Sequence, residues 1–187
     1  MAIGKSLLWG ARVAGALIAT SALAGCGIAP GDYEIYRIGL AKTTESAGCY
    51  WMPGDGDPEI PDNLASDTNN IRASGTWIIY ASAEDKLYLD TGEATFEGAT
   101  SDDGFTFGGK DVNVEFIGPM ADSKFTTTTV TTINIITDGD AITGTGTVKK
   151  SFKCSGASCG TEPQPACTQS TTFVGTYVED IELKHDI

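Results

Sequence analysis

The stretch FTTTTVTTINIITDGDAITGTGTVKKSFKC, residues 125–154, decides the fold. At its centre, Asp138-Gly139 is a dipeptide that accepts a positive φ at both central positions of a tight turn. Residues rich in Thr, Val and Ile stand on both sides of this turn, and these residue types favour strands. The stretch therefore predicts one long antiparallel hairpin with arms at 125–136 and 141–153.

The second arm indicates which face of the hairpin points inward. Successive side chains of a strand point to opposite faces. One parity carries threonines and Lys149, whereas the other is apolar or glycine, with Lys150 as the exception. The glycines are expected to let the strand bend or to make room for a large neighbour. The expected inner face consists of Ile142, Gly144, Gly146, Val148 and Phe152.

Runs of the same type continue along the chain, with Gly- and Asp-rich turn signals between most of them. They are DYEIYRIGL (32–40), GTWIIYAS (75–82), KLYLD (86–90), ATFEG (94–98), GFTFGGK (104–110), VNVEFIG (112–118) and STTFVGTYVEDIEL (170–183). Residues 52–70, with three prolines and five acids, predict a long loop, with one helical turn near 61–65. We predict an all-β fold, an antiparallel meander that closes into an up-and-down, lipocalin-like barrel and so removes exposed edges. A two-sheet β-sandwich is the alternative.

The N-terminus has the order of a secretory signal. Lys5 and Arg12 precede VAGALIATSAL (13–23), an apolar run of eleven residues that is too short to span a bilayer. The run ends in LAGC (23–26), which resembles the lipobox of bacterial lipoproteins. This resemblance implies cleavage before Cys26 and acylation there, with fatty acids such as palmitate. Gly27, not Asp, follows the cysteine, so the resemblance implies the outer membrane.

These boundaries divide the chain into a signal peptide (1–25), a lipidated tether (26–31) and one β-rich domain (32–187). Without residues 1–25 the chain keeps 10 basic and 25 acidic residues, a balance of 10 − 25 = −15, against −13 for the whole chain. A surface this negative repels nucleic acid and anionic lipid headgroups. The membrane is therefore expected as a partner only through the N-terminal lipid.

Four internal cysteines remain in an oxidising compartment, which predicts two disulfides. Sequence alone allows three pairings. We favour Cys154–Cys167, which would flank a hairpin loop, together with Cys49–Cys159. A zinc site is disfavoured, because C-x4-C-x7-C lacks the usual knuckle spacing.

The acidic loop is a weak candidate for calcium, with Asp55, Asp57 and Glu59 as oxygen ligands. The EF-hand pattern fails because Ile60 stands where that loop needs Gly. Asp102 and Asp103 are the next candidates. A solvated acidic loop is the simpler interpretation, and we expect neither a metal nor a cofactor.

Gly75-Thr76-Trp77 resembles the G-x-W signature of lipocalins, in which the Trp packs across the closed end of the barrel. In lipocalins this motif opens the first strand, whereas here a strand is expected before it. The resemblance implies a similar architecture, and architecture alone does not imply function.

Catalysis has little support in the sequence. The only histidine is His185, near the C-terminus, and no G-x-S-x-G, HExxH or phosphate-loop motif occurs. We predict a protein that is not an enzyme but an envelope lipoprotein with a binding role, with a small apolar ligand inside the barrel. The alternative is a structural or adhesive surface protein acting through its acidic loops (52–70), and an envelope protein is the other expected partner besides a small apolar ligand. The carrier hypothesis predicts a cavity behind Trp77, Phe107, Phe116, Phe173 and Tyr177.

Overall fold

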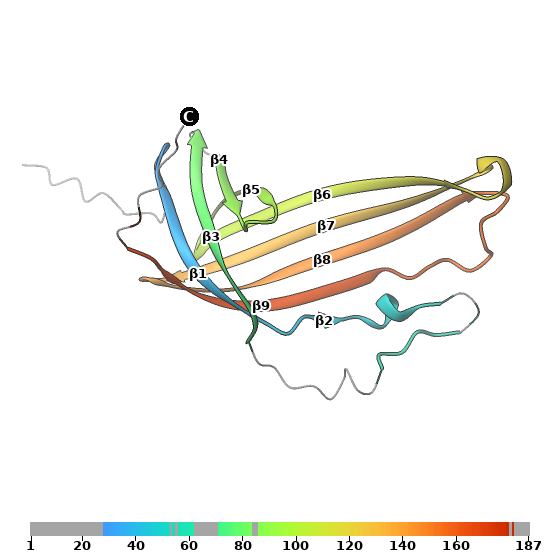
Figure 1. Cartoon of the computed structure of the whole chain (residues 1–187), viewed down its shortest axis with the longest axis horizontal. Coiled ribbons are helices and arrows are strands. Elements are labelled where there is room, and N and C mark those ends of the chain that lie inside the picture. The colour runs from blue at the N-terminus through green and yellow to red at the C-terminus, as the bar shows by residue number, and fades with distance from the viewer. Residues whose placement is uncertain are drawn as a thin grey trace, which may run out of the picture.

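The protein forms one nine-stranded antiparallel sheet that closes on itself (Figure 1). The computed structural model describes residues 28–52, 54, 56–61, 71–83, 86–179 and 181. The sheet order is β1-β3-β4-β5-β6-β7-β8-β9-β2, and β1 also pairs with β9. Eight strands therefore make a closed up-and-down barrel, and the short strand β2 is added beside β9. The predicted all-β barrel is confirmed, and the sandwich alternative is wrong.

The elements follow the order of the chain. The strands are β1 (Tyr33–Ala41), β2 (Thr44–Glu45), β3 (Ile71–Ala83), β4 (Lys86–Asp90), β5 (Thr95–Ser101), β6 (Gly104–Ile117), β7 (Ser123–Asp138), β8 (Ala141–Gly156) and β9 (Cys167–Tyr177). Two 3-10 turns, η1 (Ala47–Tyr50) and η2 (Pro119–Ala121), lie between strands. In the part of the chain described, no helix is long and apolar enough to cross a bilayer.

The predicted hairpin is confirmed as β7–β8. Its register runs without a shift from Ser123 opposite Gly156 to Asp138 opposite Ala141. The central residues of the turn are Gly139 and Asp140 and not Asp138-Gly139, because Asp138 still pairs with Ala141. Of the two, Gly139 alone has a positive φ, 58°, a left-handed conformation that glycine adopts readily.

One strand is longer than expected. The runs at 104–110 and 112–118 are a single strand, β6, because every residue from Gly104 to Ile117 pairs with β7. The paired glycines 108 and 109 lie within this strand and do not form a turn between two strands. The helical turn expected near 61–65 lies almost wholly outside the described residues.

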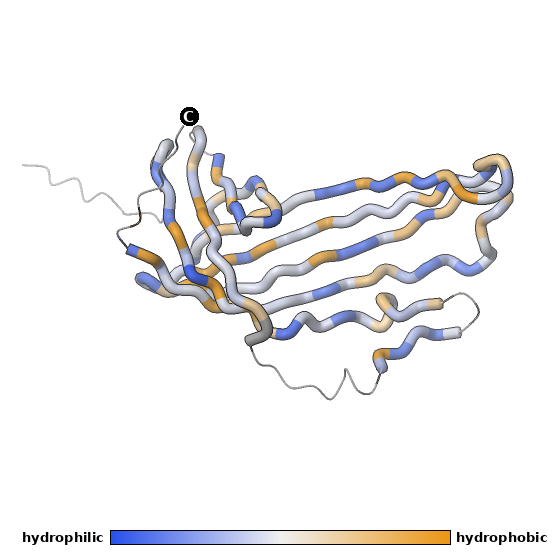
Figure 2. Tube along the Cα trace, in the orientation of Figure 1, coloured by the Kyte–Doolittle hydropathy of each residue, from blue (hydrophilic) through white to orange (hydrophobic). Residues whose placement is uncertain are grey.

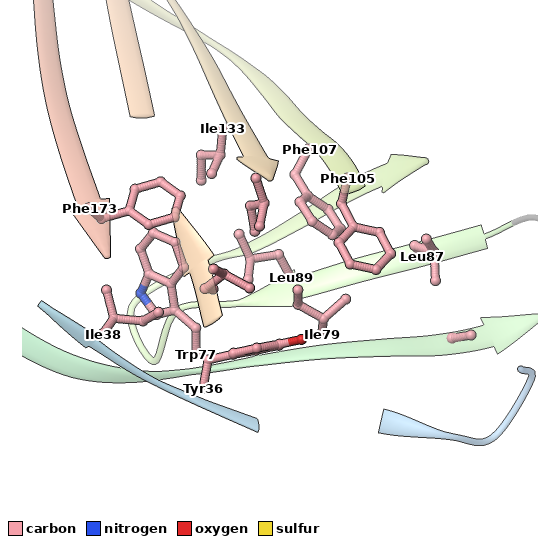
Figure 3. Packing of buried hydrophobic residues seen from close by; sticks show 13 residues of the cluster. Tyr36, Ile38, Trp77, Ile79, Leu87, Leu89, Phe105, Phe107, Ile133 and Phe173 are labelled. Carbon is pink, nitrogen blue, oxygen red and sulfur yellow. The ribbon is translucent and has the colours of Figure 1, made fainter. Parts of the chain in front are cut away.

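Buried hydrophobic side chains pack together inside the barrel (Figure 3). Trp77 on β3 packs edge-to-face on Phe173 of β9, with ring centroids 4.7 Å apart. Gly144 lies opposite Phe173 in the register, and a Cβ atom at Gly144 would stand 2.5 Å from that ring. The glycine thus makes room for a large neighbour, as its parity predicted. The buried residues around this pair include Tyr36, Ile38, Ile79, Leu89, Phe105, Phe107, Ile133, Ile135 and Ile142.

Beyond the core, four long strands continue as a curved arm (Figure 1). We define the arm as residues 109–117 of β6, 123–131 of β7, 148–156 of β8 and 167–170 of β9. The pairing of β5 with β6 runs from Gly104 to Gly108 and ends there. Beyond Gly108, β6 therefore forms the edge of the arm among the described residues. On the other side, β2 pairs with β9.

The two predicted disulfides form with a different pairing. Cys49 bonds to Cys167 and Cys154 to Cys159, so the favoured pairing was wrong. The register explains the difference. Cys167 begins β9 opposite Lys150, and β9 then runs toward Ala141 and away from Cys154, so no residue of β9 lies at the level of Cys154. Cys154 therefore closes its own turn with Cys159, and Cys167 meets η1.

Candidate functional site

A pocket of about 530 Å³ opens at the mouth of the barrel, above the filled core. Trp77 of β3 and Phe173 of β9 line it together with Leu40 of β1, Ile133 of β7 and Val148 of β8. Apolar side chains from five strands therefore meet around one opening. The polar members of the lining are Lys42, Thr43, Glu93, Thr131, Thr147, Gln169 and Thr171.

The pocket exists because the inner side chains become smaller at this level. Ile133 is opposite Gly146 in the β7–β8 register, and Gly146 is opposite Thr171 on β9. A Cβ atom at Gly146 would find its nearest neighbour 3.9 Å away, so this glycine borders open space. Glycine and threonine thus replace the large aromatic side chains of the core, and the barrel interior is left open above Trp77 and Phe173.

Farther along the inner face, a polar cluster joins β2 and η1 to β9. The Tyr50 hydroxyl donates to Glu45 Oε2 at 2.5 Å, and Gln169 Nε2 donates to Glu45 Oε1 at 2.6 Å. These bonds, Tyr50 first, and the positive charge of Lys150 lower the pKa of Glu45 below its ordinary value, although desolvation opposes them. The bond to Glu45 raises the pKa of Tyr50. The arrangement holds η1 against the arm beside the Cys49–Cys167 disulfide.

A second, larger pocket of about 750 Å³ lies at the far end of the arm. Its aromatic lining comes from Trp51, Phe125 and Phe152, and the last two rings stack with centroids 6.1 Å apart. The turn closed by Cys154 and Cys159 forms one wall. The inner face of the sheet therefore carries an apolar pocket near the core and an aromatic pocket at the tip, with the Glu45 cluster between them.

The residues named for a cavity are in three different environments. Trp77 and Phe173 line the mouth pocket, as predicted. Phe107 is fully buried in the core, and Tyr177 packs edge-to-face on Tyr36 with ring centroids 5.8 Å apart. The prediction for Phe116 was wrong, because its side chain is 68% exposed on the outer face of the arm. The parity of β6 explains this, since Phe105 and Phe107 point inward and residue 116 has the opposite parity.

The sequence reasoning missed Leu40, Thr131 and Thr171 as pocket residues. The alternation of side chains along each strand could have identified two of them. Leu40 lies two residues from the buried Ile38, and Thr171 two residues from Phe173, so each points to the same inner face as its neighbour. The size of the pocket also depends on cross-strand register, which no single strand reveals.

The weak calcium candidates do not form a cluster in the described structure. Asp57, Glu59, Asp102 and Asp103 are all exposed. No three His, Cys, Asp or Glu side chains in the described ranges are placed to share a metal ion. Asp55, Cys26, His185 and the expected signal peptide lie outside the described residues.

Comparison of the chain with protein-family profiles, with curated proteins and with solved structures found no match.

Proposed function

We propose that this protein is an envelope lipoprotein, anchored through Cys26, that binds a small apolar ligand in the mouth of its barrel and does not catalyse a reaction. The observation that carries the proposal is the open pocket above Trp77 and Phe173, with its predominantly apolar lining. Ligand pockets are concave and mostly apolar, with a few polar groups that fix orientation. Lys42 and Glu93 supply such groups in the lining.

The ligand is placed at the mouth and not in the centre of the barrel, because the centre is filled. Ile79, Leu89 and Phe107 have no exposed surface. A ligand there would have to displace close-packed side chains, and opening a cavity of that size costs several kcal/mol. The alternative, adhesion through residues 52–70, depends on a segment of which the structure describes only 52, 54 and 56–61.

The binding test uses residues 27–187, which include the whole described barrel, and the uncharged fluorophore N-phenyl-1-naphthylamine as the probe. Binding should raise probe emission and quench Trp77, which lies in the pocket lining. Ala73→Arg places a long charged side chain across the mouth and should weaken binding at least roughly tenfold, equivalent to about 1.4 kcal/mol.

The matched control is Ser74→Arg, at the next residue of β3. Ser74 is exposed and its side chain points to the opposite face of the strand. Equal loss of binding in the two variants, or no loss in Ala73→Arg, would contradict the proposed site.

The membrane anchor is tested separately in the exporting host. Cys26→Ala removes the thiol that acylation needs, so we expect the protein to leave the membrane fraction. Persistence of the variant in that fraction would count against lipidation at Cys26.

A further inference from the structure

The outer face of the arm carries an ordered array of lysine and apolar side chains. The registers of β6, β7 and β8 place twelve outer-face residues in four rows across three strands. The rows are Lys110–Val130–Lys149, Val112–Thr128–Ser151, Val114–Thr126–Lys153 and Phe116–Lys124–Ser155. We call these twelve residues the outer patch. It holds four lysines, four apolar residues, four hydroxyl residues and no acid.

The charge of the outer patch is opposite to that of the chain. The whole sequence carries 25 acids against 12 basic residues, yet the acids of arm strand β6, Asp111 and Glu115, have the parity of the inner face. None of the four lysines forms an ion pair with a described residue; the ion pair found, Lys86–Glu97, lies elsewhere. The strand alternation therefore leaves only positive charge in the outer patch, whereas the acids of arm strand β6 lie on the inner face together with Lys150.

The apolar members of the outer patch are exposed. Val112 is 49% exposed and Phe116 68%, and Met120, in the turn at the tip of the arm, is 97% exposed. Figure 2 shows the alternation of apolar and polar residues along the distal part of β6. Exposed apolar side chains surrounded by polar residues typically mark an interaction surface.

We propose that the outer patch is a membrane-contact surface that binds anionic phospholipid headgroups through its lysines and inserts Phe116 at the headgroup boundary. Binding at such an interface combines buried apolar area with attraction to anionic lipid. Each lysine held close to an anionic bilayer strengthens binding by about fivefold.

The large negative net charge does not prevent this contact, because charges are screened by salt. Packed sheets lie about 10 Å apart, and the side chains of each sheet fill about half of that space. The side chains on the two faces of one sheet therefore end on the order of 10 Å apart. The Debye length at physiological ionic strength is about 8 Å. The acids behind the sheet are therefore largely screened from a bilayer that touches the lysines. The expectation that the protein repels anionic lipid applies to its other faces.

This inference does not rest on the proposed ligand site, which is on the opposite face of the sheet. The test uses residues 27–187 without the N-terminal lipid, so that acyl chains do not produce binding themselves. Sedimentation with vesicles compares phosphatidylcholine alone with phosphatidylcholine that contains about one third phosphatidylglycerol. We expect binding to the anionic vesicles only, and its loss at high salt.

Two variants with one matched control locate the contact. Lys149→Gln with Lys153→Gln should lower the partition coefficient roughly 25-fold, from about fivefold for each lysine. Phe116→Ser should lower it roughly tenfold through the lost burial of the ring. The control Lys150→Gln removes one positive charge from the residue next to Lys149, whose side chain lies on the inner face; it should leave binding nearly unchanged, whereas Lys149→Gln alone should weaken it about fivefold.

The proposal is overturned if the protein binds both vesicle types equally or neither, or if Lys150→Gln weakens binding as much as Lys149→Gln alone. A concentration-dependent dimer that is disrupted by Lys149→Gln with Lys153→Gln, without vesicle binding, would also overturn it and assign the patch to a second copy of the chain. Ala73→Arg, which tests the ligand site, should bind anionic vesicles normally, so failure of one proposal is distinguishable from failure of the other.

Discussion

Gly144 and Gly146 lie two residues apart on the inner face of β8, but their surroundings differ. A Cβ atom at Gly144 would stand 2.0 Å from the Asn134 carbonyl oxygen and 2.5 Å from the Phe173 ring, whereas at Gly146 the nearest atom is 3.9 Å away. We expect Gly144→Ala to destabilise the protein by about 1–3 kcal/mol, because an overpacked core must shift.

The same substitution at Gly146 is the control for Gly144→Ala. There it should be neutral or stabilise by up to about 1 kcal/mol, since glycine loses more conformational entropy on folding. Urea unfolding of the two variants measures the difference. Equal destabilisation by both would show that the inner face is not open at Gly146.

Glu45 gives the arm a pH dependence whose sign follows from its lowered pKa. A carboxyl group with a lowered folded-state pKa stabilises the fold above its ordinary pKa of 4.5 and loses that contribution as the pH falls through the folded value. We therefore expect Glu45→Gln to be less stable than the wild type at pH 7, with the difference disappearing on acidification.

Tyr50→Phe tests the origin of this effect, because it removes the hydrogen bond that lowers the pKa of Glu45 most. Like Glu45→Gln, it should make the stability of the fold decrease less as the pH is lowered. Chemical unfolding at a series of pH values measures both variants. A stability difference that is constant with pH would contradict the assignment to Glu45.

Among the elements, those defined by local pattern could be predicted and those defined by distant partners could not. Strand β4 has the bounds of the run KLYLD, because the alternation that defines it is local. The β7–β8 hairpin follows from Asp138-Gly139 in the same way. The disulfide pairing was wrong because it depends on where β9 begins relative to Lys150, which is a property of the sheet.

The two disulfides close loops of very different length and should differ in their contribution to stability. The Cys49–Cys167 separation is 118 residues and the Cys154–Cys159 separation is five. By loop-closure entropy, the first should stabilise by about 5 kcal/mol and the second by about 2 kcal/mol. We expect Cys49→Ser with Cys167→Ser to lower the urea midpoint clearly more than Cys154→Ser with Cys159→Ser. The reverse order would mean that the long loop is already constrained in the unfolded chain.

At the scale of the whole molecule, the inner face could be predicted in part. The sequence named Trp77 and Phe173 among the residues around a cavity, and both line the mouth pocket, but it did not reveal that the pocket lies above a filled core. The outer patch was also hidden, because its lysines and apolar residues come from three strands and meet only through the β6–β7–β8 register. Charge summed over a sequence does not reveal that one patch of a sheet holds only positive charge.

The molecule should consist of a stable barrel and a more labile arm, although β6 passes through both. Residues 104–108 of β6 lie between β5 and β7, and Phe105 and Phe107 are buried among core side chains. Residues 109–117 pair with β7 alone within the described ranges, and nearly all of them are exposed. Local opening is easiest where buried apolar contacts are few and backbone hydrogen bonds are exposed to solvent.

Hydrogen–deuterium exchange of native residues 27–187 should therefore divide β6 in two. Amides of 109–117 that point to the open edge have no strand partner, so peptides covering them should exchange well before peptides covering 104–108. Anionic vesicles should slow the exchange of the arm peptide and leave the barrel peptide unchanged, because they cover the outer patch. Equal protection along all of β6 without vesicles would mean that another segment or a second copy already covers the edge, and the arm would then not be free to meet a membrane.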